Sequence, residues 1–173
     1  MRIPIITVAA LLTAVGGVQA QSDSTATAEL RRPDGERAGE VLLRQTPGSG
    51  TLLTIDLTGL EPGVYAIHIH ETGSCEPPTF ESAGGHFAPE RRSHGFLHPD
   101  GPHAGDLINL RVPASGEVST ERLATFVTLS DGAANSLFDA DGSAIVVHAG
   151  SDDYASQPSG DAGDRLACGV VMR

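Results

Sequence analysis

Turn-forming residues interrupt this sequence so often that they leave no room for long helices. The chain of 173 residues contains 21 glycines and 11 prolines, and the segments between them are short. Residues 51–57 show the two-residue period of a half-buried strand, because leucine and isoleucine alternate there with threonine and aspartate. Short apolar runs of this kind, separated by turns, are typical of antiparallel sandwiches and barrels.

The predicted strands are the short apolar and β-branched segments between these turns: residues 25–31, 39–45, 51–57, 64–70, 107–112, 124–129, 144–148 and 166–172. Two long segments, 71–106 and 149–165, do not fit as strands. Loops of that length in a compact domain are usually functional. We therefore predict an all-β fold, an antiparallel Greek-key barrel or sandwich of about eight strands with two long functional loops.

The first 20 residues are typical of an export signal that is removed from the mature protein. Arg2 precedes an apolar stretch, and Val18-Gln19-Ala20 places small residues where a signal peptidase requires them. The stretch is too short and too interrupted for a membrane span. We therefore predict a signal peptide at residues 1–20, a single domain at residues 21–173, and a protein that is periplasmic or secreted.

The charge balance of the chain argues against binding to nucleic acid. The chain has 22 acidic residues and 11 basic ones, all of them arginine, and its formal net charge is −11. Nucleic-acid binding depends on basic side chains that neutralise phosphates, which this chain lacks in excess. We therefore predict no nucleic-acid partner. A homodimer is compatible with the sequence.

The chain has two cysteines, Cys75 and Cys168, which are expected to pair. Export places a protein in an oxidising compartment, where two cysteines normally form a disulfide. Their bond would close a loop of roughly 90 residues, which is worth roughly 4–5 kcal/mol in the chain-entropy model. This disulfide is predicted to have a structural role and to lie next to the functional site.

All seven histidines lie in one half of the chain, between positions 68 and 148. His68 and His70 end the apolar run 64–70, and residues two apart on a strand project from the same face. His148 ends the apolar run 144–148 and could reach the same place from a neighbouring strand. Three histidines at strand ends are predicted to converge on one metal ion.

The first long loop supplies a second group of donors, namely His86, His94, His103 and Asp106. Three imidazoles and one carboxylate form a plausible tetrahedral zinc set. An all-imidazole set at the strand ends suits Cu(II) instead. The sequence therefore predicts two metals of different chemistry within one domain.

The number of donors limits how two metals can be held. Two four-coordinate sites need eight ligand bonds, and the seven donors are His68, His70, His86, His94, His103, His148 and Asp106. One site could keep an open position, His98 could supply the missing donor, or one imidazole could bind both metals through its two nitrogens. The residues alone leave these three arrangements open.

Two segments of the chain resemble the signature sequences of the copper/zinc superoxide dismutase family. They are residues 66–74, AIHIHETGS, and residues 160–170, GDAGDRLACGV. The segments Gly84-Gly85-His86-Phe87, His94-Gly95, 101–107 and Val146-Val147-His148 fill the interval in matching order. The resemblance covers essentially all of the predicted mature chain and is most similar to the bacterial periplasmic branch.

The resemblance implies one copper and one zinc ion per subunit. It implies that copper is held by His68, His70, His86 and His148, and zinc by His86, His94, His103 and Asp106. His86 would then be the imidazole that binds both metals. Asp152 would link a copper ligand to a zinc ligand, Arg165 would lie beside copper at the channel mouth, and Cys75 would pair with Cys168.

The activity implied by the resemblance is the conversion of two superoxide anions to oxygen and hydrogen peroxide, an antioxidant reaction driven by copper redox cycling. His86 and Arg165 would be its catalytic residues. A copper carrier without turnover and a zinc-only hydrolase are the competing functions.

The chain departs from the family in two places. His98 has no ligand role there, and the segment from His148 to Arg165 is short and lacks lysine.

Overall fold

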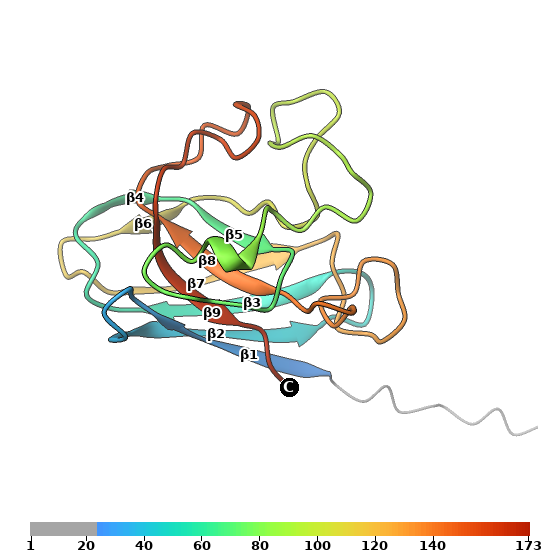
Figure 1. Ribbon diagram of the computed structural model, residues 1–173, viewed down its shortest axis with the longest axis horizontal. Coiled ribbons are helices and arrows are strands. Elements are labelled where there is room, and N and C mark those ends of the chain that lie inside the picture. Colours follow the sequence, from blue (N-terminus) through green and yellow to red (C-terminus); the bar gives the residue numbers. More distant parts are fainter. Residues whose placement is uncertain (1–23) are drawn as a thin grey trace, which may run out of the picture.

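Alternating apolar residues build a curled antiparallel sheet, which a computed structural model describes for residues 24–173 (Figure 1). The predicted signal peptide lies outside the described residues. The elements are β1 (Thr25–Arg31), β2 (Arg37–Gln45), β3 (Thr51–Leu57), β4 (Gly63–Tyr65), β5 (Ile67–His70), the 3-10 helix η1 (Glu81–Ala83), β6 (Leu110–Val112), β7 (Val118–Ala124), β8 (Ala144–His148) and β9 (Arg165–Val170). The predicted all-β fold is confirmed.

Seven strands form the main sheet, in the order β5-β8-β9-β1-β2-β3-β7, and every pair is antiparallel. The two remaining strands, β4 and β6, pair with each other. Because β4 leads into β5 and β6 leads into β7, this small ribbon links the two edges of the main sheet. The result is a half-barrel, with the connection from β3 to β4 crossing from one edge toward the other.

The core fills the concave side of the curled sheet. In β1, Ala26, Ala28 and Leu30 are buried while the residues between them are exposed, as the two-residue period of a strand requires. In contrast, every residue of β5 and β8 is buried. These two strands are covered on both faces, because the long loops lie over their outer side. The metal-binding side chains are found on that outer side.

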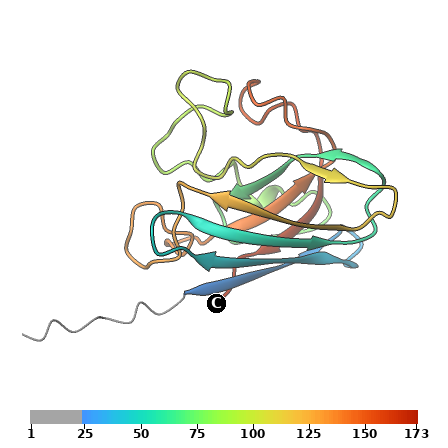
Figure 2. The ribbon, with the colours of Figure 1, turned by 180° about the vertical axis from the view of Figure 1, so that it is seen from behind.

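Both long loops project from the same side of the sheet, as the two opposite views show (Figures 1 and 2). Hydrogen bonds join them, for example from the Leu97 N–H to the Tyr154 carbonyl at 3.0 Å. Within residues 24–173, no helix has the length and hydropathy that crossing a bilayer requires.

One predicted strand was wrong, and others had shifted ends. Residues 124–129 are not a strand, and the edge strand is β7, residues 118–124. Only Val118 and Ala124 of β7 are buried. The residues between them are mostly polar, so this segment lacks the apolar alternation from which the other strands were predicted. The apolar side chains of Val127 and Leu129 instead close one end of the core, where Gln45 Oε1 accepts a hydrogen bond from the Leu129 N–H at 2.8 Å.

The predicted strand 64–70 is interrupted at Ala66, which leaves β4 and β5 on either side. The Ala66 N–H donates to the Gly150 carbonyl, and the Ala66 carbonyl accepts from the His148 N–H. This residue therefore joins the strand that carries His68 to the start of the second long loop. The predicted strand 107–112 contracts to β6 at residues 110–112.

Candidate metal centre

Strand pleating places the two histidines of β5 on the outer face of the sheet. Ile67 and Ile69 point into the core, so the alternate residues His68 and His70 point the opposite way, beneath the long loops. His148 ends β8 on the same outer face as Val146, which pairs with His68. All three imidazoles are buried.

The first long loop returns twice to β5 and brings the other donors there. Isolated β-bridges pair His86 with His70 and Asp106 with His68. The loop is also fixed by Gly105, whose N–H donates to the Phe87 carbonyl at 2.8 Å. A Cβ on Gly105 would lie 2.2 Å from the Ile69 carbonyl oxygen, so only glycine permits this close approach.

The donors form two groups that share one residue. In each group the ligand atoms lie within 4.8 Å of one another. The first group is His68, His70, His86 and His148, and the second is His86, His94, His103 and Asp106. We name them the copper group and the zinc group after the metals that the sequence predicts for them. The structure therefore brings together all seven predicted donors, with His86 between the two groups. His98 belongs to neither group, and its Nδ1 accepts a hydrogen bond from the Asp100 N–H at 3.1 Å.

Three buried ring nitrogens in these groups have no hydrogen-bond partner among residues 24–173. They are Nδ1 of His68, Nε2 of His86 and Nδ1 of His103. A buried polar atom without a partner costs free energy, and such atoms are few in native proteins. A metal ion that accepts their lone pairs satisfies all three, so the residues present fit the two metals.

The copper group contains a further contact that only a cation can satisfy. Nε2 of His70 lies 3.3 Å from Nε2 of His148. The Nδ1 atoms of the same rings lie 3.0 Å from the Gly84 carbonyl and 3.2 Å from the Gly163 carbonyl. Because a carbonyl only accepts, each Nδ1 carries the ring proton, and the two facing Nε2 atoms present lone pairs to each other.

Asp106 is the centre of the zinc group. Its Oδ1 lies 2.8 Å from Nδ1 of His86, 3.0 Å from Nδ1 of His94 and 3.3 Å from Nδ1 of His103. Its Oδ2 accepts hydrogen bonds from the N–H groups of Gly95, at 2.8 Å, and His103, at 2.9 Å. One carboxylate oxygen therefore faces three imidazoles while the other is held by the backbone.

Asp152 connects the two groups through the far nitrogens of two rings. Its Oδ2 lies 2.8 Å from Nε2 of His68, and its Oδ1 lies 2.9 Å from Nε2 of His94. Accepting both Nε2 protons leaves Nδ1 of each ring free for a metal. Partners of this kind fix the tautomer and the orientation of a ligand.

Burial and charge set the protonation of the cluster in the metal-free chain. Burial, reinforced by nearby histidines, lowers the pKa of His70 to about 2 and that of His148 to about 3. Burial also lowers the pKa of His86 to about 4, although Asp106 opposes the shift. These imidazoles are therefore neutral at pH 7, which is the form that binds a metal.

The carboxylates act in the opposite direction on His94. Burial lowers its pKa, but hydrogen bonds and attraction to Asp106 and Asp152 outweigh that effect and raise the pKa to about 9. The pKa values of both carboxyls fall below their usual range, because the hydrogen bonds from their histidine neighbours outweigh the cost of burial. Before any metal enters, the Asp106 carboxylate is therefore ionised and faces a protonated His94.

A cavity of about 350 Å³ opens onto both groups. It is lined by His70, Gly85, His86, His103, His148, Pro158, Ser159, Gly163 and Arg165. The two long loops thus form its walls, and the strand-end histidines form its floor. A small molecule or ion can reach the copper group by this route.

Arg165 is fixed at this cavity by the backbone of the first long loop. Its Nη1 donates to the Phe80 carbonyl at 2.6 Å, and its Nη2 donates to the Gly84 carbonyl at 2.7 Å. The Gly84 carbonyl also accepts from Nδ1 of His70. The guanidinium is therefore locked beside a copper-group histidine, where it gives the cavity its only cationic side chain among the lining residues.

Comparison with known proteins shows which family this chain belongs to. The family model for copper/zinc superoxide dismutase (SODC) matches residues 37–171. The chain belongs to the copper/zinc superoxide dismutase family. "Superoxide dismutase [Cu-Zn] 2" of Aquifex aeolicus is 49% identical over 150 residues, which cover 86% of this chain and 87% of that protein.

Solved structures of this family share the fold. The crystal structure of a SOD-like protein from Bacillus subtilis has a TM-score of 0.82 and 39% identity, covering 84% of this chain and 97% of that one. Cu/Zn superoxide dismutase from Brucella abortus has a TM-score of 0.69 and 31% identity, covering 85% and 99%.

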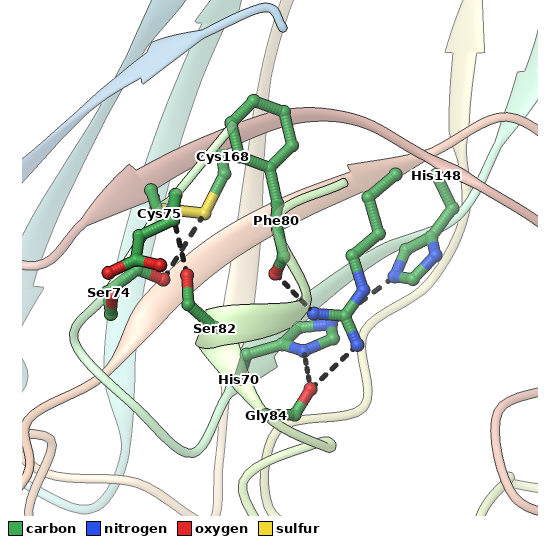
Figure 3. The surroundings of a disulfide bond; sticks show 10 residues. His70, Ser74, Cys75, Phe80, Ser82, Gly84, His148 and Cys168 are labelled. Carbon is green, nitrogen blue, oxygen red and sulfur yellow. Dashed lines mark hydrogen bonds between the residues drawn. A yellow bond between two sulfur atoms is a disulfide. The ribbon is translucent and has the colours of Figure 1, made fainter. Parts of the chain in front are cut away.

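The predicted disulfide is present and ties the first long loop of this family member to its last strand. Cys75 and Cys168 are bonded, with their Cα atoms 5.7 Å apart and the two residues 93 positions apart in sequence (Figure 3). The Cys75 segment continues through Phe80 to Gly84, whose carbonyl groups hold Arg165. The disulfide therefore fixes the loop whose carbonyl groups hold Arg165 at one side of the cavity.

Sequence analysis missed two carboxamides that hold the second long loop of this superoxide dismutase. Asn109 Oδ1 accepts from the Asp152 N–H, and its Nδ2 donates to the Asp152 carbonyl, both at 2.9 Å. Gln157 makes the same pair of bonds with the main chain of His94. Asparagine and glutamine in loops are common, and nothing in their spacing distinguishes these two.

Proposed function

We propose that this chain is an exported superoxide dismutase whose copper ligands are His68, His70, His86 and His148 and whose zinc ligands are His86, His94, His103 and Asp106. The reaction combines two superoxide anions with two protons to give oxygen and hydrogen peroxide. The observation that carries this assignment is the position of His86, which belongs to both donor groups and has one nitrogen without a partner.

Copper, when bound, supplies the one-electron redox chemistry, while zinc supplies a redox-inert positive charge. The protein's own contribution begins with substrate binding. Arg165 offers the superoxide anion a positive charge inside the cavity, where it acts at short range despite the acidic surface of the chain. His70 and His148 stay neutral and therefore remain available as ligands.

His86 is the residue that moves a proton in this proposal. Its Nε2 is buried and free of hydrogen bonds to the described residues, its Nδ1 lies beside Asp106, and the residue lines the cavity. A proton held on Nε2 is thus placed to pass to the peroxide product, while Asp106 keeps the ring from rotating. Asp152 holds His68 and His94 in matching orientations on the two sides of His86.

A copper carrier without turnover is the alternative function. A carrier needs a group of metal ligands and an entry path, but it does not need a cationic side chain fixed beside the metal ion. The clamp on Arg165 by two carbonyl groups, together with a complete second donor group, supports the enzyme instead.

Export to the periplasm, after removal of residues 1–20, is supported by the leader-like sequence and by the disulfide. Disulfides persist in oxidising compartments and are rare in the cytosol. The amino terminus of protein purified from a periplasmic fraction should begin near Gln21, whereas an uncleaved Met1 would contradict this. A homodimer stays a prediction of the sequence, which light scattering on the purified protein tests directly.

The test of the activity compares two metal loadings of the same protein. Superoxide removal by the copper-and-zinc form should greatly exceed removal by the zinc-only form. Equal activity of the two forms would exclude a redox role for copper. A copper-and-zinc form that holds both metals without consuming superoxide would support the carrier.

A further inference from the structure

Gln157, in the second long loop, makes both hydrogen bonds that the main chain of His94 forms within residues 24–173. Its Oε1 accepts from the His94 N–H at 2.9 Å, and its Nε2 donates to the His94 carbonyl at 2.9 Å. Nε2 also donates to the Ala155 carbonyl at 2.9 Å, which fixes the carboxamide within its own loop. His94 is fully buried, so its main chain has no access to water while Gln157 is in place.

The ring of His94 is oriented by two carboxylates, one on each side. Nε2 lies 2.9 Å from Asp152 and Nδ1 lies 3.0 Å from Asp106. The ring can meet both only if the backbone of residue 94 stays in place. The carboxamide of Gln157 supplies that constraint, because it pairs with this one residue as a neighbouring strand would.

We propose that Gln157 is a positioning residue for zinc, which directs Nδ1 of His94 into the zinc group by holding its main chain. The inference rests on the zinc ligands of the proposed function. Gln157 makes no hydrogen bond to any copper-group residue in the described part of the chain, so its effect falls on zinc rather than copper.

The position of Gln157 also ties zinc binding to the cavity wall. The next two residues, Pro158 and Ser159, line the cavity together with Arg165. Loss of the Gln157 hydrogen bonds is therefore expected to loosen both the main chain of His94 and the part of the cavity wall that Pro158 and Ser159 form. Zinc affinity and the shape of this cavity wall are therefore expected to change together when Gln157 is replaced.

The test replaces Gln157 in the full chain and measures zinc and copper separately. Gln157→Met keeps the length of the side chain and removes both hydrogen bonds. By the usual effect of residues that orient metal ligands, the dissociation constant for zinc should rise about 10- to 100-fold, while that for copper changes less than about threefold. The absorption spectrum of Co²⁺ bound in place of zinc should change as well.

Asn135→Ala is the matched control. It also removes a bond from a carboxamide to a carbonyl, Asn135 Nδ2 to Phe126 at 2.8 Å, but in a turn that carries no metal donor. It should leave both metal affinities unchanged. If Gln157→Met fails to fold, Gln157→Glu replaces it. This variant keeps the acceptor for the His94 N–H, exchanges the donor for an oxygen that repels the His94 carbonyl, and adds one negative charge. It should weaken zinc in the same selective way.

Three results would overturn the inference. The first is a zinc affinity in the variant that equals that of the unaltered protein. The second is an equal loss of zinc and copper, which indicates general loosening rather than positioning of His94. The third is an unaltered protein that does not bind zinc through His94. This last result refutes the proposed ligand set itself, whereas the first two leave it intact.

Discussion

Nε2 of His70 faces Nε2 of His148 across 3.3 Å, although the other nitrogen of each ring already lies against a backbone carbonyl. Two lone pairs at this distance repel each other, and a cation between them removes the repulsion. Nε2 of His86, buried without a partner, belongs to the same group. Metal binding and folding are therefore expected to be coupled in this protein.

Removal of the Arg165 charge should slow superoxide consumption without removing the metals. Arg165→Ala is expected to lower kcat/KM by about 10-fold and to flatten its dependence on ionic strength, because local charge accelerates the encounter of an anion with the site. Arg31→Ala, which removes an exposed arginine paired with Glu29, serves as the control. Kinetics of Arg165→Ala that match those of the control would remove Arg165 from catalysis.

Replacement of Asp152 should weaken zinc, because this carboxylate orients His68 and His94. Asp152→Ala is expected to raise the dissociation constant for zinc about 10- to 100-fold. The adjacent Asp153 is exposed and its carboxylate accepts hydrogen bonds from Ala155 and Ser156 in the following turn, so Asp153→Ala is a matched control. Competition with a chelator measures both variants, and similar zinc affinities for the two would contradict the role of Asp152.

Acid should destabilise the metal-free protein from neutral pH downward. The folded pKa values of His70, His148 and His86 are lowered to about 2, 3 and 4, whereas an unfolded chain takes up these protons near pH 6.5. Stability is therefore lost as the pH falls from 6.5 toward these values. His94, with its pKa raised to about 9, contributes stability that is complete below pH 6.5 and lost as the pH rises through 9.

Urea unfolding of the chelated protein across pH measures this dependence, with maximum stability expected near pH 6.5. His148→Gln removes one of the three lowered pKa values and should make the acid side shallower by about 1.4 kcal/mol per pH unit, the value for one proton. An acid side that keeps its full slope in this variant would contradict the assignment.

Loss of the disulfide should destabilise the fold and disturb the cavity. Cys75→Ser combined with Cys168→Ser is expected to cost roughly 4–5 kcal/mol in the chain-entropy model, given the 93 positions between the cysteines. Because the Cys75 loop holds Arg165 through Phe80 and Gly84, activity should also fall in metal-loaded samples. If the double variant unfolded at the same urea concentration and kept full activity, the disulfide would neither stabilise the fold nor support the cavity.

The strands that the sequence predicted well are those with a strict apolar alternation or a continuous apolar run. Residues 25–31, 51–57 and 144–148 are strands with the predicted bounds. In contrast, β7 carries polar residues over most of its length and was missed, because edge strands need little apolar surface.

The convergence of His68, His70 and His148 was predictable because strand geometry explains their positions. The loop donors His86, His94, His103 and Asp106 were predictable only from their residue types. The choice among the three ligand arrangements was not predictable from spacing, since it depends on how the first long loop folds back onto β5. Asn109 and Gln157 act through backbone contacts between loops far apart in sequence, with 43 and 63 positions between partners. Such contacts leave no local pattern.

The most direct measurement is a crystal structure of the protein loaded with both metals, with anomalous scattering recorded at the copper and zinc absorption edges. We expect copper next to Nε2 of His86 and zinc next to Nδ1 of the same ring, at the roughly 2.0–2.1 Å usual for metal–imidazole bonds. A His86 side chain that contacts only one ion, or neither, would contradict the shared imidazole.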